Sequence, residues 1–125
     1  MVDGSRERQI VDKKVDTIEV TEKDNGVALE LKRGETLAIK LECVPGTGYS
    51  WHIAKNDDAL MEMLGEPTYE APKNKTIGGM EYKLFRFKAL SAGTDLLELQ
   101  YKRIWEKEKK PQRIFSIKVK INPEN

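Results

Sequence analysis

Short apolar runs with a period of two, separated by turn residues roughly every ten positions, dominate this sequence. In the clearest run, residues 37–43, apolar side chains at the odd positions alternate with Ala38, Lys40 and Glu42. Because successive side chains of a strand point to opposite faces, this alternation predicts a β-strand with one buried face. Further strands are predicted over residues 15–20, 27–31, 49–53, 67–72, 80–89, 97–101 and 115–121.

Seven or eight short strands with regular turn signals are typical of an all-β fold, and we predict an Ig-like β-sandwich. The segment 55–66 departs from the pattern, because Asn56-Asp57-Asp58 can cap a short helix before Gly65. A packed turn is an equally good interpretation of this segment. Residues 67–72 carry a proline at each end, which suits a strand at the edge of a sheet.

A chain of 125 residues is long enough for one hydrophobic core and one domain. We expect residues 1–14, which are mostly charged and polar, to form a flexible N-terminal arm, and residues 15–125 to form the domain. The sequence has neither an apolar run of transmembrane length nor the apolar centre of a signal peptide near Met1. We therefore expect no membrane partner, and either a cytoplasmic protein or an exported one whose leader has been removed.

The charge balance argues against a general nucleic-acid binder, because the sequence has 22 Lys and Arg residues and 21 Asp and Glu residues, with no marked basic excess. Residues 102–120 are locally basic, and a sheet face with Tyr101 and Trp105 could in principle bind single-stranded nucleic acid. A solvated strand and loop is the favoured interpretation of this segment. We therefore expect no nucleic-acid partner.

Little in the sequence supports catalysis. One histidine, His52, and one cysteine, Cys43, leave no set of ligands for a typical zinc site and no internal disulfide. A Cys43–His52 nucleophilic pair is conceivable, but Cys43 is in phase with the apolar face of its strand and is expected to be a buried small hydrophobe. We predict that the protein is not an enzyme, with no catalytic residue, no cofactor and no metal.

The segment between the strands 37–43 and 49–53 is rich in residues that shape the backbone: Pro45, Gly46 and Gly48 surround Thr47. Proline fixes φ, and glycine permits positive φ. We therefore predict a defined loop with little side-chain bulk, whose backbone can approach another molecule closely.

This loop and two later segments resemble the chagasin-like inhibitors of papain-family cysteine peptidases over residues 20–122. The first motif of that family is Asn-Pro-Thr-Thr-Gly before an aromatic residue and a Trp, and the second is Gly-x-Gly-Gly. The third is Arg-Pro-Trp or Arg-Pro-Phe at the end of a strand. The matching segments here are Val44–Trp51, Thr76–Gly79 and Arg103–Trp105.

The resemblance implies a monomeric, reversible, non-covalent inhibitor that inserts three adjacent loops into the active-site cleft of a papain-like cysteine peptidase. It implies that Trp105 is a dominant contact, whereas Trp51, in phase with Tyr49 and Ile53, is expected in the core. The peptidase-binding residues that it implies are Pro45, Gly46, Thr47, Gly48, Tyr49, Ile77, Gly78, Gly79, Arg103 and Trp105.

Four residues depart from the motifs of the family: Val44, Gly46, Thr76 and Ile104. Val44 cannot form the side-chain hydrogen bond that an asparagine can make to the loop backbone. Ile104 in place of proline adds conformational entropy that binding must remove. These departures keep an alternative open, a non-inhibitory Ig-like binding or adhesion domain whose loops have drifted.

Overall fold

The computed structural model describes residues 17–73 and 79–123, and the predicted arm, residues 1–14, lies outside the described part. Within these ranges the chain forms nine strands and two short 3-10 helices. Their bounds are β1 Thr17–Thr21, η2 Glu22–Asp24, β2 Ala28–Lys32, β3 Thr36–Cys43, η3 Pro45–Thr47, β4 Ser50–Lys55, β5 Met61–Met63, β6 Thr68–Glu70, β7 Glu81–Ala89, β8 Gly93–Lys102 and β9 Arg113–Asn122.

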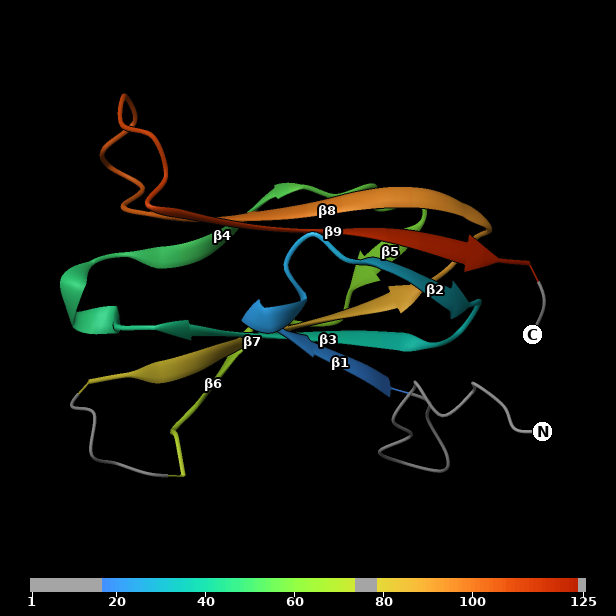
Figure 1. The fold of residues 1–125 in the computed structure, drawn as a ribbon, viewed down its shortest axis with the longest axis horizontal. Coiled ribbons are helices and arrows are strands. Elements are labelled where there is room, and N and C mark those ends of the chain that lie inside the picture. Colours follow the sequence, from blue (N-terminus) through green and yellow to red (C-terminus); the bar gives the residue numbers. More distant parts are fainter. Residues whose placement is uncertain (1–16, 74–78, 124–125) are drawn as a thin grey trace.

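The strands form two sheets that face each other, so the predicted sandwich is confirmed (Figure 1). One sheet has the order β1-β3-β7-β5, with β6 also paired to β7, and the other has the order β2-β9-β8-β4. The pairs β1–β3 and β2–β9 are parallel, whereas the remaining pairs are antiparallel.

The core lies between the sheets and follows the predicted alternation. In β3 the side chains of Leu37, Ile39 and Leu41 are fully buried, and Cys43 is almost so. Trp51 is buried at 2% exposure, as predicted, and its indole Nε1 donates a 2.9 Å hydrogen bond to the backbone carbonyl of Glu42. A buried indole N–H needs such an acceptor, so Trp51 both fills the core and joins β4 to β3.

The helix considered for residues 55–66 is absent, and a turn followed by β5 takes its place. The carbonyl of Asp57 accepts hydrogen bonds from the amides of Leu60 and Met61, which closes a single turn. The Asp57 amide donates to the buried carboxylate of Asp95, and Met61 is fully buried opposite Ala89 of β7. Burial of Met61 and pairing with β7 therefore override the local helix signal.

One strand that was not predicted, β5, raises the count to nine, above the seven or eight expected. β5 and β6 both pair with β7, and β6 lies within the edge strand predicted over residues 67–72, between the two prolines. No helix of residues 17–73 and 79–123 is long and apolar enough to span a membrane.

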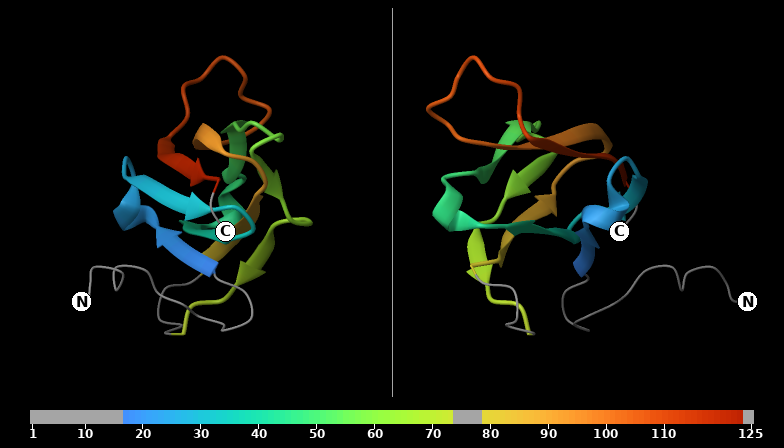
Figure 2. Two further views of the ribbon diagram at one scale, coloured as in Figure 1. Left: turned by 90° about the vertical axis from the view of Figure 1, so that its right-hand side faces the viewer. Right: turned by 60° about the vertical axis from the view of Figure 1, so that its left-hand side comes forward.

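Strand register places the ends of several strands together. Ser50 of β4 lies opposite Lys102 of β8, and Cys43 of β3 lies opposite Glu81 of β7. The β3–β4 connection, the β8–β9 connection and the start of β7 therefore lie at one end of the sandwich, as Figures 1 and 2 show.

Candidate functional site

The first loop, residues 44–49, is a closed 3-10 turn rather than an open connection. The amide of Thr47 donates to the carbonyl of Val44, and the amide of Gly48 donates to the carbonyl of Pro45. Gly48 then takes φ +84°, a left-handed conformation that favours glycine. Val44, Pro45, Gly46 and Thr47 are exposed, so the compact turn presents mainly backbone and small side chains.

Thr47 supplies the side-chain hydrogen bond that Val44 cannot make. Its hydroxyl Oγ1 donates a 2.7 Å hydrogen bond to the Val44 carbonyl and accepts one of 3.3 Å from the amide of Tyr49. Thr47, near the end of the turn, therefore closes the loop with its side chain. The turn keeps a stabilising side-chain hydrogen bond although Val44 stands where the family motif has asparagine.

The third loop, residues 103–112, is fastened to the first loop by Arg103. Its Nε donates a 3.0 Å hydrogen bond to the carbonyl of Thr47, and its Nη1 lies 3.2 Å from the carboxylate of Glu106. The guanidinium carbon lies 4.5 Å from the centre of the Tyr49 ring. The planar guanidinium thus stacks and donates at the same time, which a lysine cannot do.

Trp105 is outside the core, as expected, with 63% of its side chain exposed beside the exposed Ile104. The indole lies over Gly48, where a Cβ atom would be only 2.6 Å from Trp105 Cη2. Because Gly48 has no side chain, the indole can lie directly against the backbone of the first loop.

The second loop falls mostly outside the described residues, which is the case for Thr76, Ile77 and Gly78. Gly79 is described, has φ +77°, and would place a Cβ atom 3.7 Å from Cγ1 of Val44. The end of the second loop therefore adjoins the first loop.

Two residues outside the predicted binding set support the first loop: Tyr101 contacts it directly, and Arg113 contacts Tyr101. The hydroxyl of Tyr101 accepts a 3.0 Å hydrogen bond from the amide of Val44, and its ring stacks on Tyr49 with 5.5 Å between ring centres. Arg113 lies 5.2 Å from the centre of the Tyr101 ring. The inward phase of Tyr101 in its strand was a visible signal, whereas nothing local indicated Arg113.

The Cys43–His52 pair has the wrong environment for catalysis. Cys43 is buried, and burial together with the charge of Glu81 raises the pKa of its thiol, although Lys83 acts in the opposite direction. Burial and then the charge of Lys83 lower the pKa of His52. His52 follows the inward-facing Trp51 along β4, so it points away from the core that surrounds Cys43.

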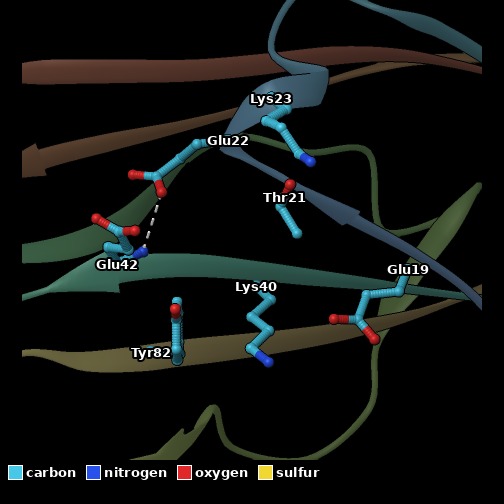
Figure 3. A pocket seen from close by; sticks show the side chains of 7 residues that line it. All are labelled: Glu19, Thr21, Glu22, Lys23, Lys40, Glu42 and Tyr82. Atoms are coloured by element: carbon cyan, nitrogen blue, oxygen red, sulfur yellow. Dashed lines mark hydrogen bonds between the residues drawn. The ribbon is translucent and has the colours of Figure 1, made fainter. Parts of the chain in front are cut away.

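Other site types also find no support in residues 17–73 and 79–123. No group of three His, Cys, Asp or Glu side chains is arranged to hold a metal. Tyr101 is 4% exposed and cannot form a platform for a nucleic acid. A depression over β1, η2, β3 and β7 has lining of mixed charge, with Glu19, Thr21, Glu22, Lys23, Lys40, Glu42 and Tyr82 (Figure 3).

The chain is similar to a family of peptidase inhibitors and to individual members of it. The family model described as "Chagasin family peptidase inhibitor I42" matches residues 30–119. Amoebiasin-2 of Entamoeba histolytica is 31% identical over 104 residues, which cover 82% of this chain and 83% of that protein. Chagasin of Trypanosoma cruzi is 28% identical over 106 residues, which cover 82% of this chain and 96% of that protein.

A solved structure shows the same fold. The crystal structure of EhICP2, described as a cysteine protease inhibitor from Entamoeba histolytica, has a TM-score of 0.76 at 29% identity and covers 85% of this chain and 96% of that one. The fold is therefore the Ig-like sandwich of these inhibitors. By its sequence and its structure, this chain belongs to the chagasin family of peptidase inhibitors, which are not enzymes.

Proposed function

We propose that this protein is a reversible, non-covalent inhibitor of papain-like cysteine peptidases that inserts its three adjacent loops into the active-site cleft. Membership of the family supports inhibition of a peptidase, and the resemblance of the three loop motifs to those of chagasin-like inhibitors supports the papain-like class. The binding residues that we propose are Pro45, Gly46, Thr47, Gly48, Tyr49, Ile77, Gly78, Gly79, Arg103 and Trp105.

One observation carries the proposal: a large, exposed indole is held against a compact loop. Trp105 is 63% exposed, lies over Gly48, and follows Arg103, which is bonded to Thr47. Exposure of a tryptophan on a fixed surface leaves apolar area for a partner to bury, and such anchors dominate the energetics of interfaces. Because the loop is already ordered by its own hydrogen bonds, less conformational entropy is lost on binding.

The first loop also suits binding without reaction. It is a hydrogen-bonded 3-10 turn ending in a left-handed Gly48, and it offers the peptidase small side chains and backbone. None of Pro45, Gly46 and Thr47 carries a group that forms a covalent bond with a thiolate. We therefore expect complexes that dissociate to the intact inhibitor.

The test is inhibition of papain with a fluorogenic peptide, comparing the wild type with Trp105→Ala and Thr47→Asp. We expect the first variant to raise the inhibition constant Ki by about 30-fold, since truncation of an interface anchor costs about 2 kcal/mol or more. We also expect Thr47→Asp to weaken inhibition, because a carboxylate cannot donate to the Val44 carbonyl. Leu96→Ala is the matched control, an exposed apolar residue on β8 outside the loops.

Reversibility has its own measurement. Activity should return after dilution of the complex, and the mass of the recovered inhibitor should be unchanged. Permanent inactivation or a cleaved inhibitor would contradict the non-covalent mechanism. A folded wild type that leaves papain and related enzymes active would refute inhibition of this class and favour the non-inhibitory binding domain.

A further inference from the structure

Four flat side chains contact one another in series from the third loop, through the buried Tyr101, to Arg113 at the start of β9. The Arg103 guanidinium lies 4.5 Å from the Tyr49 ring centre, the Tyr49 ring lies 5.5 Å from the Tyr101 ring, and the Arg113 guanidinium lies 5.2 Å from the Tyr101 ring. We call these four residues the stack. Guanidinium groups and aromatic faces attract each other, so each side chain of the stack restricts the position of the next one.

The Arg113 end of the stack is anchored on several elements. Arg113 forms an ion pair with Glu22 of η2, lies 3.5 Å from the carbonyl of Glu42, and lies 5.1 Å from the Trp51 ring centre. Glu22 in turn accepts a hydrogen bond of 3.4 Å from the Glu42 amide (Figure 3). Arg113 of β9 is thus fixed against η2, β3 and β4 together.

The middle of the stack holds the first loop. The Tyr101 hydroxyl accepts the hydrogen bond from the amide of Val44, the residue at which the first loop begins. Tyr101 itself is 4% exposed, so its ring has little freedom to move. The start of the loop is therefore held by a hydroxyl whose position is set by the stack.

We propose that Tyr101 and Arg113 are positioning residues for inhibition, which keep the first loop in its binding shape. This inference rests on the proposed function for its effect on a peptidase. When the binding-competent shape is populated only in part, the apparent dissociation constant rises by the reciprocal of that fraction. Neither residue is among the proposed peptidase-binding residues.

The test compares Tyr101→Phe and Arg113→Lys with the wild type. Tyr101→Phe keeps the ring and removes only the acceptor for Val44, and Arg113→Lys keeps the charge toward Glu22 and removes the flat group. We expect each variant to raise Ki for papain by about fivefold, equivalent to about 1 kcal/mol. Leu96→Ala should change nothing.

Amide exchange in the free protein separates positioning from general destabilisation. The amides of Thr47 and Gly48 keep their own acceptors in both variants, so faster exchange there reports loosening of the loop. We expect faster exchange at these two amides and unchanged exchange at Leu99 and Phe115, which pair within the core of the β8–β9 ladder.

The inference would be overturned if the amides of Thr47 and Gly48 exchanged at the wild-type rate in both variants. It would also be overturned if exchange became faster while Ki stayed unchanged. If the wild type fails to inhibit papain, the proposed function fails separately. Exchange at the two loop amides then still decides whether Tyr101 and Arg113 hold the loop.

Discussion

The contact between Gly48 and Trp105 gives the sharpest prediction for this protein. In Gly48→Ala the new Cβ atom would lie 2.6 Å from Trp105 Cη2. Carbon atoms in contact prefer about 3.5 Å or more, so the indole has to move by about 1 Å or swing away. Because Trp105 is exposed, we expect it to move rather than to distort the sandwich.

The effect on stability should come mainly from the backbone. Gly48 has φ +84°, and an L-residue in this region costs about 1–2 kcal/mol. In a domain of this size that loss lowers Tm by about 4 °C for each kcal/mol. Gly26 has φ +85° with nothing within 4 Å of its Cβ position, so Gly26→Ala has the same strain without the indole.

The two variants should therefore match in stability and differ in function. We expect Gly26→Ala to inhibit papain as the wild type does, and Gly48→Ala to raise Ki at least tenfold, approaching the loss of about 2 kcal/mol that we assign to Trp105→Ala. Thermal unfolding and a fluorogenic assay measure both quantities.

A double variant tests the cause. If displacement of the indole explains the loss, Gly48→Ala should add little to the Ki of Trp105→Ala, because neighbouring residues that act together are not additive. Equal Ki values for Gly26→Ala and Gly48→Ala, or full additivity in the double variant, would refute the reasoning.

Three further predictions concern other parts of the molecule. Arg103→Lys should raise Ki about tenfold despite the retained charge, because lysine cannot both donate to Thr47 and stack on Tyr49. The Cys43 thiol should be alkylated more slowly in the folded than in the unfolded protein at about pH 8.5, because burial raises its pKa. The contribution of this shift to stability is present at lower pH and is lost as the pH rises further. Burial lowers the pKa of His52, so the contribution of this shift to stability is present at neutral pH and is lost as the pH falls below the ordinary histidine range. His52→Gln should remove this part of the pH dependence of urea unfolding.

Each of these has a result that would count against it. Wild-type inhibition by Arg103→Lys would mean that charge alone is sufficient at this position. Equal alkylation rates in the two states would show that the Cys43 thiol is accessible. An unchanged pH profile in His52→Gln would assign the acid-side loss of stability to other groups.

Local alternation was sufficient to predict the longer strands and the faces that they bury. Leu37, Ile39 and Leu41 are buried as their spacing indicates, and the phase of Trp51 correctly placed it in the core. The period of a strand is a property of neighbouring residues, so it can be read from the sequence. Proline and glycine likewise indicated the first loop, because their effect on φ is also local.

The segment 55–66 shows where local signals end. Asn56 and Asp57 are good helix-capping residues, but here the Asn56 side chain donates to Met61 and Asp95. β5 forms because Met61 becomes buried against β7, which is distant in the sequence. A three-residue strand has too little pattern of its own to be recognised without its partner.

The sequence by itself determined the fold class, the shaped first loop and the separation of Trp51 from the exposed Trp105. Only the tertiary structure decided how the loops are held together. Tyr101 and Val44 are 57 positions apart, and Arg103 and Thr47 are 56 positions apart, yet each pair shares a hydrogen bond. Strand register creates these contacts, and register depends on pairing across the whole domain rather than on the residues beside each loop.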